Sequence, residues 1–453
     1  MAYDVRRYPS RAPLSLELVA AFSRDLLNGM RRMDAVGGDA VVSGRGAASV
    51  LHVRHPDLVR ALLIDNNADV TKARGMRILS MLVGNGLLSS EVPTHTRQRK
   101  LVLPAFHRRR LQVYGEVMVR RSRALAESWR EGTPVDVTEA MNRLALGIAA
   151  ETLFGADVDA DAARIGHALD EAMAAFDRAQ FPLADKLMHL PLPNVRRGKR
   201  ARATVDNVVY RFIHERRASP TNRDDLLQML LDAQDEDTGL AMTDDEVRDE
   251  AVTLLMAGHE TTANALVWTW ALLAEHPDVS ARLGAEVDAL GRDPTFDDLR
   301  DGLPFTRKVL AESMRLRPPA WVFSREAARD FRLGDEVPVA KGTMILIAPY
   351  FLHRDGRFWA DPERFDPDRF TREATAARHK FAYLPFSTGR RGCIGEQFAW
   401  AEGVLALATI ARRWQLRPVG PLPRPHGSVT LRPAGSLRMD PLRRVRDTIP
   451  VGV

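Results

Sequence analysis

The chain has 453 residues, which is enough to bury a large hydrophobic core, and length alone allows two or three domains. Apolar residues make up 45% and charged residues 27% of the sequence, which is the composition of a folded globular protein and excludes extensive disorder. The single cysteine, Cys393, excludes an intramolecular disulfide framework and favours a reducing compartment. We therefore expect a cytoplasmic protein.

The first thirty residues carry charges throughout and contain neither a signal-peptide core nor an apolar run of membrane length, so we expect no membrane anchor. The net charge of +6 is spread over many arginines, with dense basic runs at residues 108–110 and 196–202. Such runs are usually solvated surface. Docking to an acidic protein ranks second, and nucleic acid ranks third because no aromatic residues are interleaved with the basic ones. We expect no nucleic-acid partner.

Most of the sequence has the pattern of helices with short breaks, and strand-like segments lie near residues 47–53, 343–347 and 427–433. The breaks at residues 181–194 and 218–225 are too short to separate autonomous domains. We therefore predict a mainly α fold with minor β, in a single domain over residues 1–453. Within it we expect an N-terminal segment at about residues 1–20 and a C-terminal tail at residues 440–453.

One predicted helix begins at Thr243, which forms a capping box with Glu246, and stops before Pro277. It has about 33 residues and is about 50 Å long, so it should cross the whole protein. Its middle is apolar and should be buried, except for the polar cluster GHETT at residues 258–262. Back-bonding of a hydroxyl, with Glu260 paired to an arginine elsewhere, explains part of this cluster. A kink at which a hydroxyl and a carboxyl line a small-ligand site explains more of it and is the favoured interpretation.

Glu312 and Arg315 lie three residues apart on a later predicted helix, so they share a face. Exposed pairs of this kind are common and contribute little. This pair, however, is followed by a Pro-Pro stop and then by a long irregular segment that leads to the cysteine. We predict that a buried network of Glu312, Arg315 and Arg369 holds that segment in place.

Cys393 lies in the segment FSTGRRGCIG, residues 386–395, which is too rich in glycine for a helix interior. Its thiol could pack in the core, act as a nucleophile, or bind a metal or cofactor. Cysteine-protease signatures are absent, and no further cysteine or histidine flanks Cys393 at the spacing that zinc needs. A haem iron needs only one strong protein ligand, and glycines let the backbone approach the macrocycle. Thiolate ligation of haem is therefore the favoured role.

This loop resembles the haem-binding loop of the cytochrome P450 superfamily, F-x-x-G-x-R-x-C-x-G, at every fixed position. The segment AGHETT, residues 257–262, resembles the oxygen-activating motif of the family's long helix, and residues 312–315 match its E-x-x-R. FDPDRF resembles the family's P-E-R-F box, with Asp368 in place of the usual glutamate. The sequence HTRQR, residues 95–99, resembles its W-x-x-x-R, with histidine in place of tryptophan. The motifs span residues 85 to 440, roughly, in the family's order.

The resemblance implies the cytochrome P450 fold, a triangular single domain with a long central helix over the haem. It implies Cys393 as the ligand of the iron, Thr261 as the catalytic hydroxyl that would hydrogen-bond the iron-bound oxygen, and Glu260 as the catalytic acid that would relay protons through water. The residues expected to bind the cofactor are His95, Arg99, Arg325, Phe386, Gly389, Arg391, Gly395, Ala257 and Gly258.

The resemblance also implies a haem-thiolate monooxygenase, with haem b as cofactor, that inserts one oxygen atom of O2 into a lipophilic molecule of terpenoid, steroid, macrolide or fatty-acid type. About 58 residues follow the loop, without a flavin or iron–sulfur signature. Electrons from NAD(P)H should therefore arrive through a separate ferredoxin or flavodoxin and its reductase, docked at Arg108, Arg109 and Arg110. We expect a monomer. The alternative is a non-oxygenating haem protein on the same scaffold, either a ligand binder or sensor or a dehydratase or isomerase.

The substrate pocket is placed only by the resemblance, at residues 76–83, 255–262, 320–323 and 434–437. The pocket residues expected there are Met76, Met81, Leu82, Leu255, Met256, Ala320, Val322, Phe323 and Ala434. These side chains are apolar, which predicts a lipophilic substrate, and the methionines predict an adaptable cavity. Because Arg325 is expected to face haem, no arginine is left to bind a carboxylate, and fatty acids rank below terpenoids and steroids.

Overall fold

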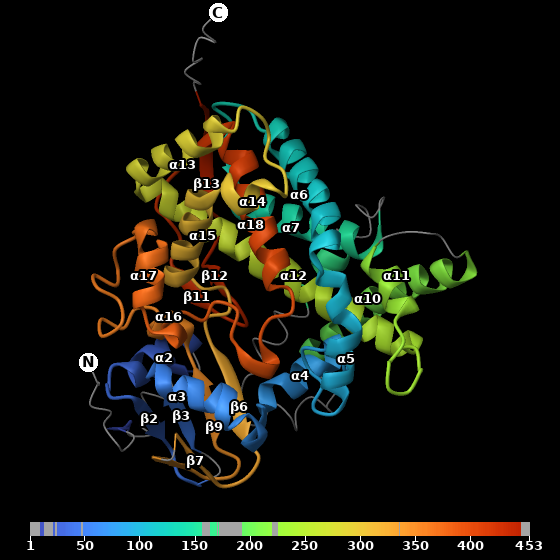
Figure 1. Ribbon diagram of the computed structural model, residues 1–453, viewed down its shortest axis with the longest axis vertical. Coiled ribbons are helices and arrows are strands. Elements are labelled where there is room, and N and C mark those ends of the chain that lie inside the picture. The colour runs from blue at the N-terminus through green and yellow to red at the C-terminus, as the bar shows by residue number, and fades with distance from the viewer. Residues whose placement is uncertain are drawn as a thin grey trace, which may run out of the picture.

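The computed structural model describes residues 10–12, 21–22, 25–46, 49–155, 164–169, 171, 193–219, 225–334 and 336–444. Helices form most of the molecule, and the largest sheet lies at one end of it, as Figure 1 shows. The helices up to the middle of the chain are α2 (Leu26–Asp34), α3 (Pro56–Arg60), α4 (Arg74–Val83), α5 (Thr94–Val102), α6 (Arg108–Ser128), α7 (Val137–Phe154), α10 (Pro193–Ala218) and α11 (Leu226–Asp232). The later ones are α12 (Asp244–Glu275), α13 (Pro277–Ala289), α14 (Asp298–Asp301), α15 (Pro304–Leu316), α16 (Pro349–Leu352), α17 (Arg372–Ala377) and α18 (Glu396–Ala411).

The largest sheet has six strands in the order β1-β2-β3-β9-β6-β4. Its strands are β1 (Ser10–Arg11), β2 (Ala40–Ser43), β3 (Val50–Val53), β4 (Val70–Lys72), β6 (Phe323–Ala327) and β9 (Met344–Ile347). The predicted strands near residues 47–53 and 343–347 are confirmed as β3 and β9, which pair in parallel with Leu51 opposite Ile345. A parallel pair needs a long crossover, and here nearly all of the helical part of the protein lies between the two strands.

The remaining strands form three small sheets. They are β7 (Phe331–Leu333) with β8 (Val337–Val339), β11 (Pro425–Gly427) with β12 (Leu431–Pro433), and β5 (Val135–Asp136) with β10 (Trp414–Pro418) and β13 (Arg438–Arg443). The strand-like segment near residues 427–433 is therefore the β11–β12 hairpin. The expected C-terminal tail is corrected, because residues 440–443 belong to β13 and pair with β10, and only residues 445–453 lie outside the described chain. Most of the expected N-terminal segment also lies outside it.

The long helix α12 has 32 residues and begins with the predicted capping box. The Thr243 side chain accepts a hydrogen bond from the backbone N–H of Glu246, and the Glu246 side chain accepts one from the backbone N–H of Thr243. Three acidic residues lie in the first turn, where their negative charges interact favourably with the positive end of the helix dipole. The helix ends at Glu275, since Pro277 begins α13. The predicted bounds are confirmed, and α12 is helical throughout, so the predicted kink does not interrupt it.

The two halves of α12 pack into different hydrophobic clusters. Residues 247–256 pack with α7, α10 and α11, and residues 263–273 pack with α6, α15 and α18. The segment 257–262 belongs to neither cluster. The polar motif of α12 therefore lies where the two cores separate and a cavity opens between them. Among the described residues, no helix is both long and apolar enough to cross a lipid bilayer.

Candidate active site

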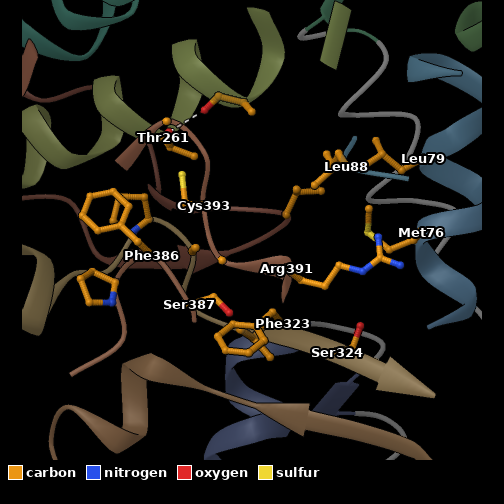
Figure 2. A pocket seen from close by; sticks show the side chains of 18 of the residues that line it. Met76, Leu79, Leu88, Thr261, Phe323, Ser324, Phe386, Ser387, Arg391 and Cys393 are labelled. Carbon is orange, nitrogen blue, oxygen red and sulfur yellow. Dashed lines mark hydrogen bonds between the residues drawn. The ribbon is translucent and has the colours of Figure 1, made fainter. Parts of the chain in front are cut away.

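A largely apolar cavity of about 1260 Å³ lies beside the middle of α12. Its walls come from α4, α7, α12, β6, the β11–β12 turn and the loop before α18. Cys393 and Thr261 both line it, and Figure 2 shows them pointing into the same space from different elements. The cavity thus brings the only thiol of the chain to the hydroxyl of the α12 motif, although the two residues lie 132 positions apart in the chain (393 − 261).

The loop that carries Cys393 is held by its own backbone. The N–H of Cys393 donates to the carbonyl of Phe386 at 3.0 Å, and the N–H of Gly392 donates to the carbonyl of Gly389 at 3.0 Å. Gly389 has a φ of +73°, and a Cβ there would lie 2.5 Å from the carbonyl oxygen of Leu63. Only glycine satisfies both constraints. Gly389 itself does not line the cavity, so it shapes the loop from behind.

The sulfur of Cys393 faces the internal cavity, where it is exposed to that space although protein surrounds it. Burial raises the pKa of the thiol to about 11, and a hydrogen bond from the backbone N–H of Gly395 opposes this shift. A thiol with this pKa stays protonated at neutral pH unless it binds a metal, which removes the proton outright. The thiol is therefore unsuited to be a free nucleophile and suited to be a ligand.

The α12 motif shows both contacts of the alternative interpretation. Thr261 Oγ1 donates to the carbonyl of Ala257 at 2.7 Å. Glu260 Oε1 accepts a hydrogen bond from Thr430 at 2.7 Å and forms an ion pair with Arg432 at 3.0 Å. Ala257, Gly258 and Thr261 line the cavity, but Glu260 does not. The predicted hydroxyl therefore faces the cavity, whereas the predicted carboxyl lies outside it.

One end of the cavity is strongly cationic. Arg325 is half-buried, and burial together with the neighbouring Arg391 lowers its pKa to about 10. Lys72, which no motif indicated, also lines the cavity, and burial and Arg391 lower its pKa to about 7. Burial and the surrounding cations lower the pKa of His95 to about 3. Arg99 donates to the carbonyl of Gly392 at 2.8 Å and thereby connects α5 to the cysteine loop.

The charges at this end are only partly compensated. Glu91 forms an ion pair with Arg391, and the guanidinium of Arg325 donates to the neighbouring carbonyl of Ser324 at 2.9 Å. Arg391 lowers the pKa of both Lys72 and Arg325 in addition to the larger effect of burial, so these cations repel one another and a bound anion would be stabilised among them. A haem has one iron and two carboxylates, and this cavity offers one thiol and a cluster of cations. The residues present therefore fit haem.

The predicted Glu312–Arg315–Arg369 network is present and buried. Arg315 donates to both carboxylate oxygens of Glu312 at 2.7 and 2.8 Å, and both side chains have no exposed surface. Arg315 also donates to the carbonyls of His353, Pro362 and Arg364, which lie in the irregular segment before the cysteine loop. Arg369 Nε lies 3.4 Å from Glu312. Burial raises the pKa of Glu312 although Arg315 opposes it, so desolvation outweighs the attraction within the pair.

Asp368, the substituted position of the P-E-R-F box, makes an ion pair of its own. Its two oxygens accept from Arg282 of α13 at 2.9 and 3.2 Å. The shorter aspartate therefore still connects this segment to a helix.

Some of the residues predicted to form the substrate pocket line the cavity, and others do not. Met76, Leu255, Ala320, Val322 and Phe323 line the cavity. The others require correction or cannot be placed.

Met81 lies on the outer face of α4 with 41% of its surface exposed. Met256 is buried in the core between α12 and its neighbours. The sequence could not predict this, because α12 is enclosed on all sides and apolar periodicity does not show which of its sides faces the cavity. Ala434 is exposed just after β12, and residues 426–429 line the cavity in its place. The side chain of Leu82 lies outside the described part of the structure.

A buried acid that sequence reasoning missed is Glu402 of α18. It is fully enclosed, burial raises its pKa well above the usual range, and the hydroxyl of Thr262 faces it. A signal was available, because this single charged residue interrupts the apolar run FAWAEGVLALATIA. This acid lies between α18 and α12, and both Thr262 and Gly403, the chain neighbour of Glu402, line the cavity.

The chain matches the sequence profile of the family described as Cytochrome P450 over residues 7–439, so it belongs to this family. It is 40% identical over 412 residues to cyclooctatin synthase from Streptomyces melanosporofaciens, covering 89% of this chain and 88% of the relative. It is 39% identical over 393 residues to cyclooctat-9-en-7-ol 5-monooxygenase from the same organism, covering 84% and 83%. Its fold resembles the crystal structure of the cytochrome P450DA heme domain with a TM-score of 0.86 and 26% identity, covering 98% of this chain and 99% of that one.

The protein is therefore a cytochrome P450 monooxygenase, an oxidoreductase of the family that uses haem and O2. The predicted fold is confirmed as well.

Proposed function

We propose that this monooxygenase hydroxylates a terpenoid, with haem b bound between α12 and the Cys393 loop. The observation that carries the proposal is one cavity with Cys393 and Thr261 on its walls and Arg99, Arg325 and Arg391 at one end. The relatives named for cyclooctatin and cyclooctat-9-en-7-ol support a carbocyclic substrate that is mostly hydrocarbon. We further propose that residues 1–453 form a single domain.

When bound, haem supplies the oxygen-activating chemistry of the family. In our proposal Cys393 holds the iron, and His95, Arg99 and Arg325 bind the carboxylates of the macrocycle. Arginine suits this role because its planar fork binds carboxylates with two hydrogen bonds. Gly258 and Gly395 leave room for a flat ligand between the two elements, since a Cβ at either position would meet no heavy atom closer than 3.7 Å.

Thr261 is placed to move protons at the cavity wall. A hydroxyl both donates and accepts, and Thr261 currently donates to the carbonyl of Ala257. It can therefore accept a proton from one neighbour while it releases its own to another. Glu260 is the group that we assign to bring protons from the solvent side, because its carboxylate lies outside the cavity next to Thr261 in the chain.

The substrate side of the cavity has few groups that could pair with a charged ligand. Around α4 and α7 its lining is mostly leucine, methionine and alanine, namely Met76, Leu79, Leu88, Ala149 and Leu153. Burying apolar surface contributes about 25 cal/mol per Å², so a hydrocarbon skeleton gains most from these walls. The cations at the other end are assigned to haem. Terpenoids therefore remain ranked above fatty acids.

Electrons would come from a separate ferredoxin or flavodoxin, and we assign its docking to the start of α6. Arg108 and Arg109 are exposed there, and the guanidinium of Arg108 lies 3.8 Å from the carboxylate of Asp297, which is a long ion pair. An acidic partner would be attracted to this surface, and the attraction should weaken with salt. We propose that the enzyme works in the cytoplasm as a monomer.

A titration of the haem spectrum with matched ligands tests the substrate class. Terpene alcohols should displace the water on the iron at low concentration, whereas fatty acids of equal carbon number should not. Met76→Ala should weaken terpenoid binding because Met76 lines the cavity, and Met81→Ala is the matched control on the same helix. Tight binding of charged ligands alone, or equal effects of the two substitutions, would contradict the proposal.

A further inference from the structure

The β11–β12 hairpin lines part of the cavity and also contacts Glu260 of the α12 motif. Ser428 and Val429, in the turn, line the cavity. Two other residues of the hairpin, Thr430 and Arg432, bind Glu260. The chain therefore connects the wall of the active site to the group that we assign to proton delivery through one short turn.

The carboxylate of Glu260 is held from one side by two donors. Its Oε1 accepts a hydrogen bond from Thr430 Oγ1 at 2.7 Å and forms an ion pair with the guanidinium of Arg432 at 3.0 Å. The side chains of Glu260 and Arg432 are 16% and 30% exposed, so this ion pair is half-buried and poorly screened by salt. Arg432 also donates to the hydroxyl of Ser428 at 3.3 Å, which fixes its direction.

The hairpin is itself fixed to α12 and to the segment before β6. Trp268, two turns after Glu260, donates from its indole to the carbonyl of Leu431 at 2.9 Å, and Asn264 donates to Thr430 Oγ1 at 3.1 Å. Trp321 donates to the carbonyl of Ser428 at 2.9 Å. Because these bonds fix the backbone of the hairpin, the guanidinium of Arg432 is presented to Glu260 in a defined place.

We propose that Arg432 is a positioning residue for proton delivery, and that it acts by holding the carboxylate of Glu260 in the orientation from which a proton can pass to the cavity. The inference rests on the proposed function, in which Glu260 supplies Thr261. In each transfer the carboxylate accepts one proton from the solvent side and releases one toward the cavity, so Glu260 returns to its ionised form. Without Arg432 the side chain of Glu260 would lose one of the partners that hold it and would sample more rotamers, and few of these would be productive.

Arg432→Met, which keeps the length of the side chain and removes its charge, tests this inference in the holoenzyme. The measurements are product and peroxide formed per electron, and the solvent deuterium isotope effect on turnover. We expect product per electron to fall between about tenfold and about a hundredfold, with peroxide rising in proportion and a larger isotope effect. Arg432→Lys should restore much of the coupling. Arg417→Met is the matched control, because Arg417 pairs with Asp440 at 3.3 Å on an exposed strand of another sheet.

A double-mutant cycle separates positioning from a structural role. In a Glu260→Gln background, Arg432→Met should add no further loss of coupling, because the group on which Arg432 acts is already absent. An equal loss in both backgrounds, or unchanged coupling in Arg432→Met, would overturn the inference. If Arg432→Met does not fold with haem, Thr430→Val removes the second donor to Glu260 and should give the same pattern with a smaller loss.

The outcome for the proposed function can be read separately. Oxygen consumption and peroxide release report the proton step with any lipophilic compound that binds. A parent enzyme that oxidises no terpenoid therefore counts against the substrate class. The comparison of Arg432→Met with the parent still decides whether Arg432 acts through Glu260.

Discussion

Replacing Glu312 by alanine tests whether the buried network controls the stability of the segment before the cysteine loop. The change removes two hydrogen bonds to Arg315, the bond from the backbone N–H of Asp366 at 2.8 Å, and the contact with Arg369. Arg315 keeps its three carbonyl partners but loses its counter-charge in a fully buried position. Removing one partner of a buried ion pair costs about 3–5 kcal/mol of unfolding free energy. The remaining carbonyl bonds place the expected loss at the lower end, near 3 kcal/mol, roughly.

Urea unfolding followed by far-UV circular dichroism gives this loss as a shift of the midpoint, and the Soret band reports haem retention in the same samples. Glu139→Ala is the control, since Glu139 pairs with Arg143 at 3.7 Å on the surface and both side chains are more than 60% exposed. The control should change stability by less than about 0.5 kcal/mol. If Glu312→Ala also costs less than about 1 kcal/mol and retains full haem, the argument that Glu312 neutralises a buried charge is wrong.

Three further predictions concern the cavity and the acid–base chemistry. Cys393→Ala should abolish the thiolate-type absorption spectrum of the reduced, CO-bound protein together with oxygenase activity; a retained thiolate spectrum would refute the assignment of Cys393. Thr261→Val keeps the shape of the side chain but removes the hydroxyl, so electrons should be diverted to peroxide while product falls; unchanged product per electron would make Thr261 structural. Burial raises the pKa of Glu250 to about 7, above its unfolded value of 4.5, so the folded state binds more protons between these values and loses stability as pH rises through 7. Glu250→Gln should therefore match the parent in urea at about pH 4 and exceed it at pH 8 by up to about 3 kcal/mol, and equal stabilities at both pH values would count against this sign.

The features that the sequence predicted best depend on neighbouring residues. The capping box of Thr243 and Glu246 and the stop at Pro277 are local, so the bounds of α12 follow from them. Gly389 is required by a short turn in which its φ is positive, so this feature also depends only on neighbouring residues. The sequence favours a ligand role for Cys393 because its glycine-rich loop leaves few other uses for the thiol. The cations Arg325 and Arg391 line the same cavity, as a cofactor with carboxylates would require.

The features that the sequence did not predict depend on packing between distant segments. Met256 lies one residue from a cavity-lining position, but α12 is enclosed on all sides and shows no apolar stripe that would give its orientation. Lys72 belongs to no sequence motif. It joins the cationic end of the cavity because β4 pairs with β6, which places Lys72 opposite Arg325. The partner of Glu260 lies 172 residues further along the chain (432 − 260), where a single arginine cannot be distinguished from a surface residue.

The cavity walls come from segments that are far apart in the chain, whereas the cysteine loop is closed by bonds among its own residues and by Arg99. A substitution at Met76, Val322 or Val429 changes the shape of the space without removing any of those bonds. Selection on the substrate and selection on cofactor retention therefore act on largely separate sets of positions. If the proposed function holds, single changes on different walls should re-target the enzyme to a differently shaped hydrocarbon, and a library that varies only these walls should keep its haem.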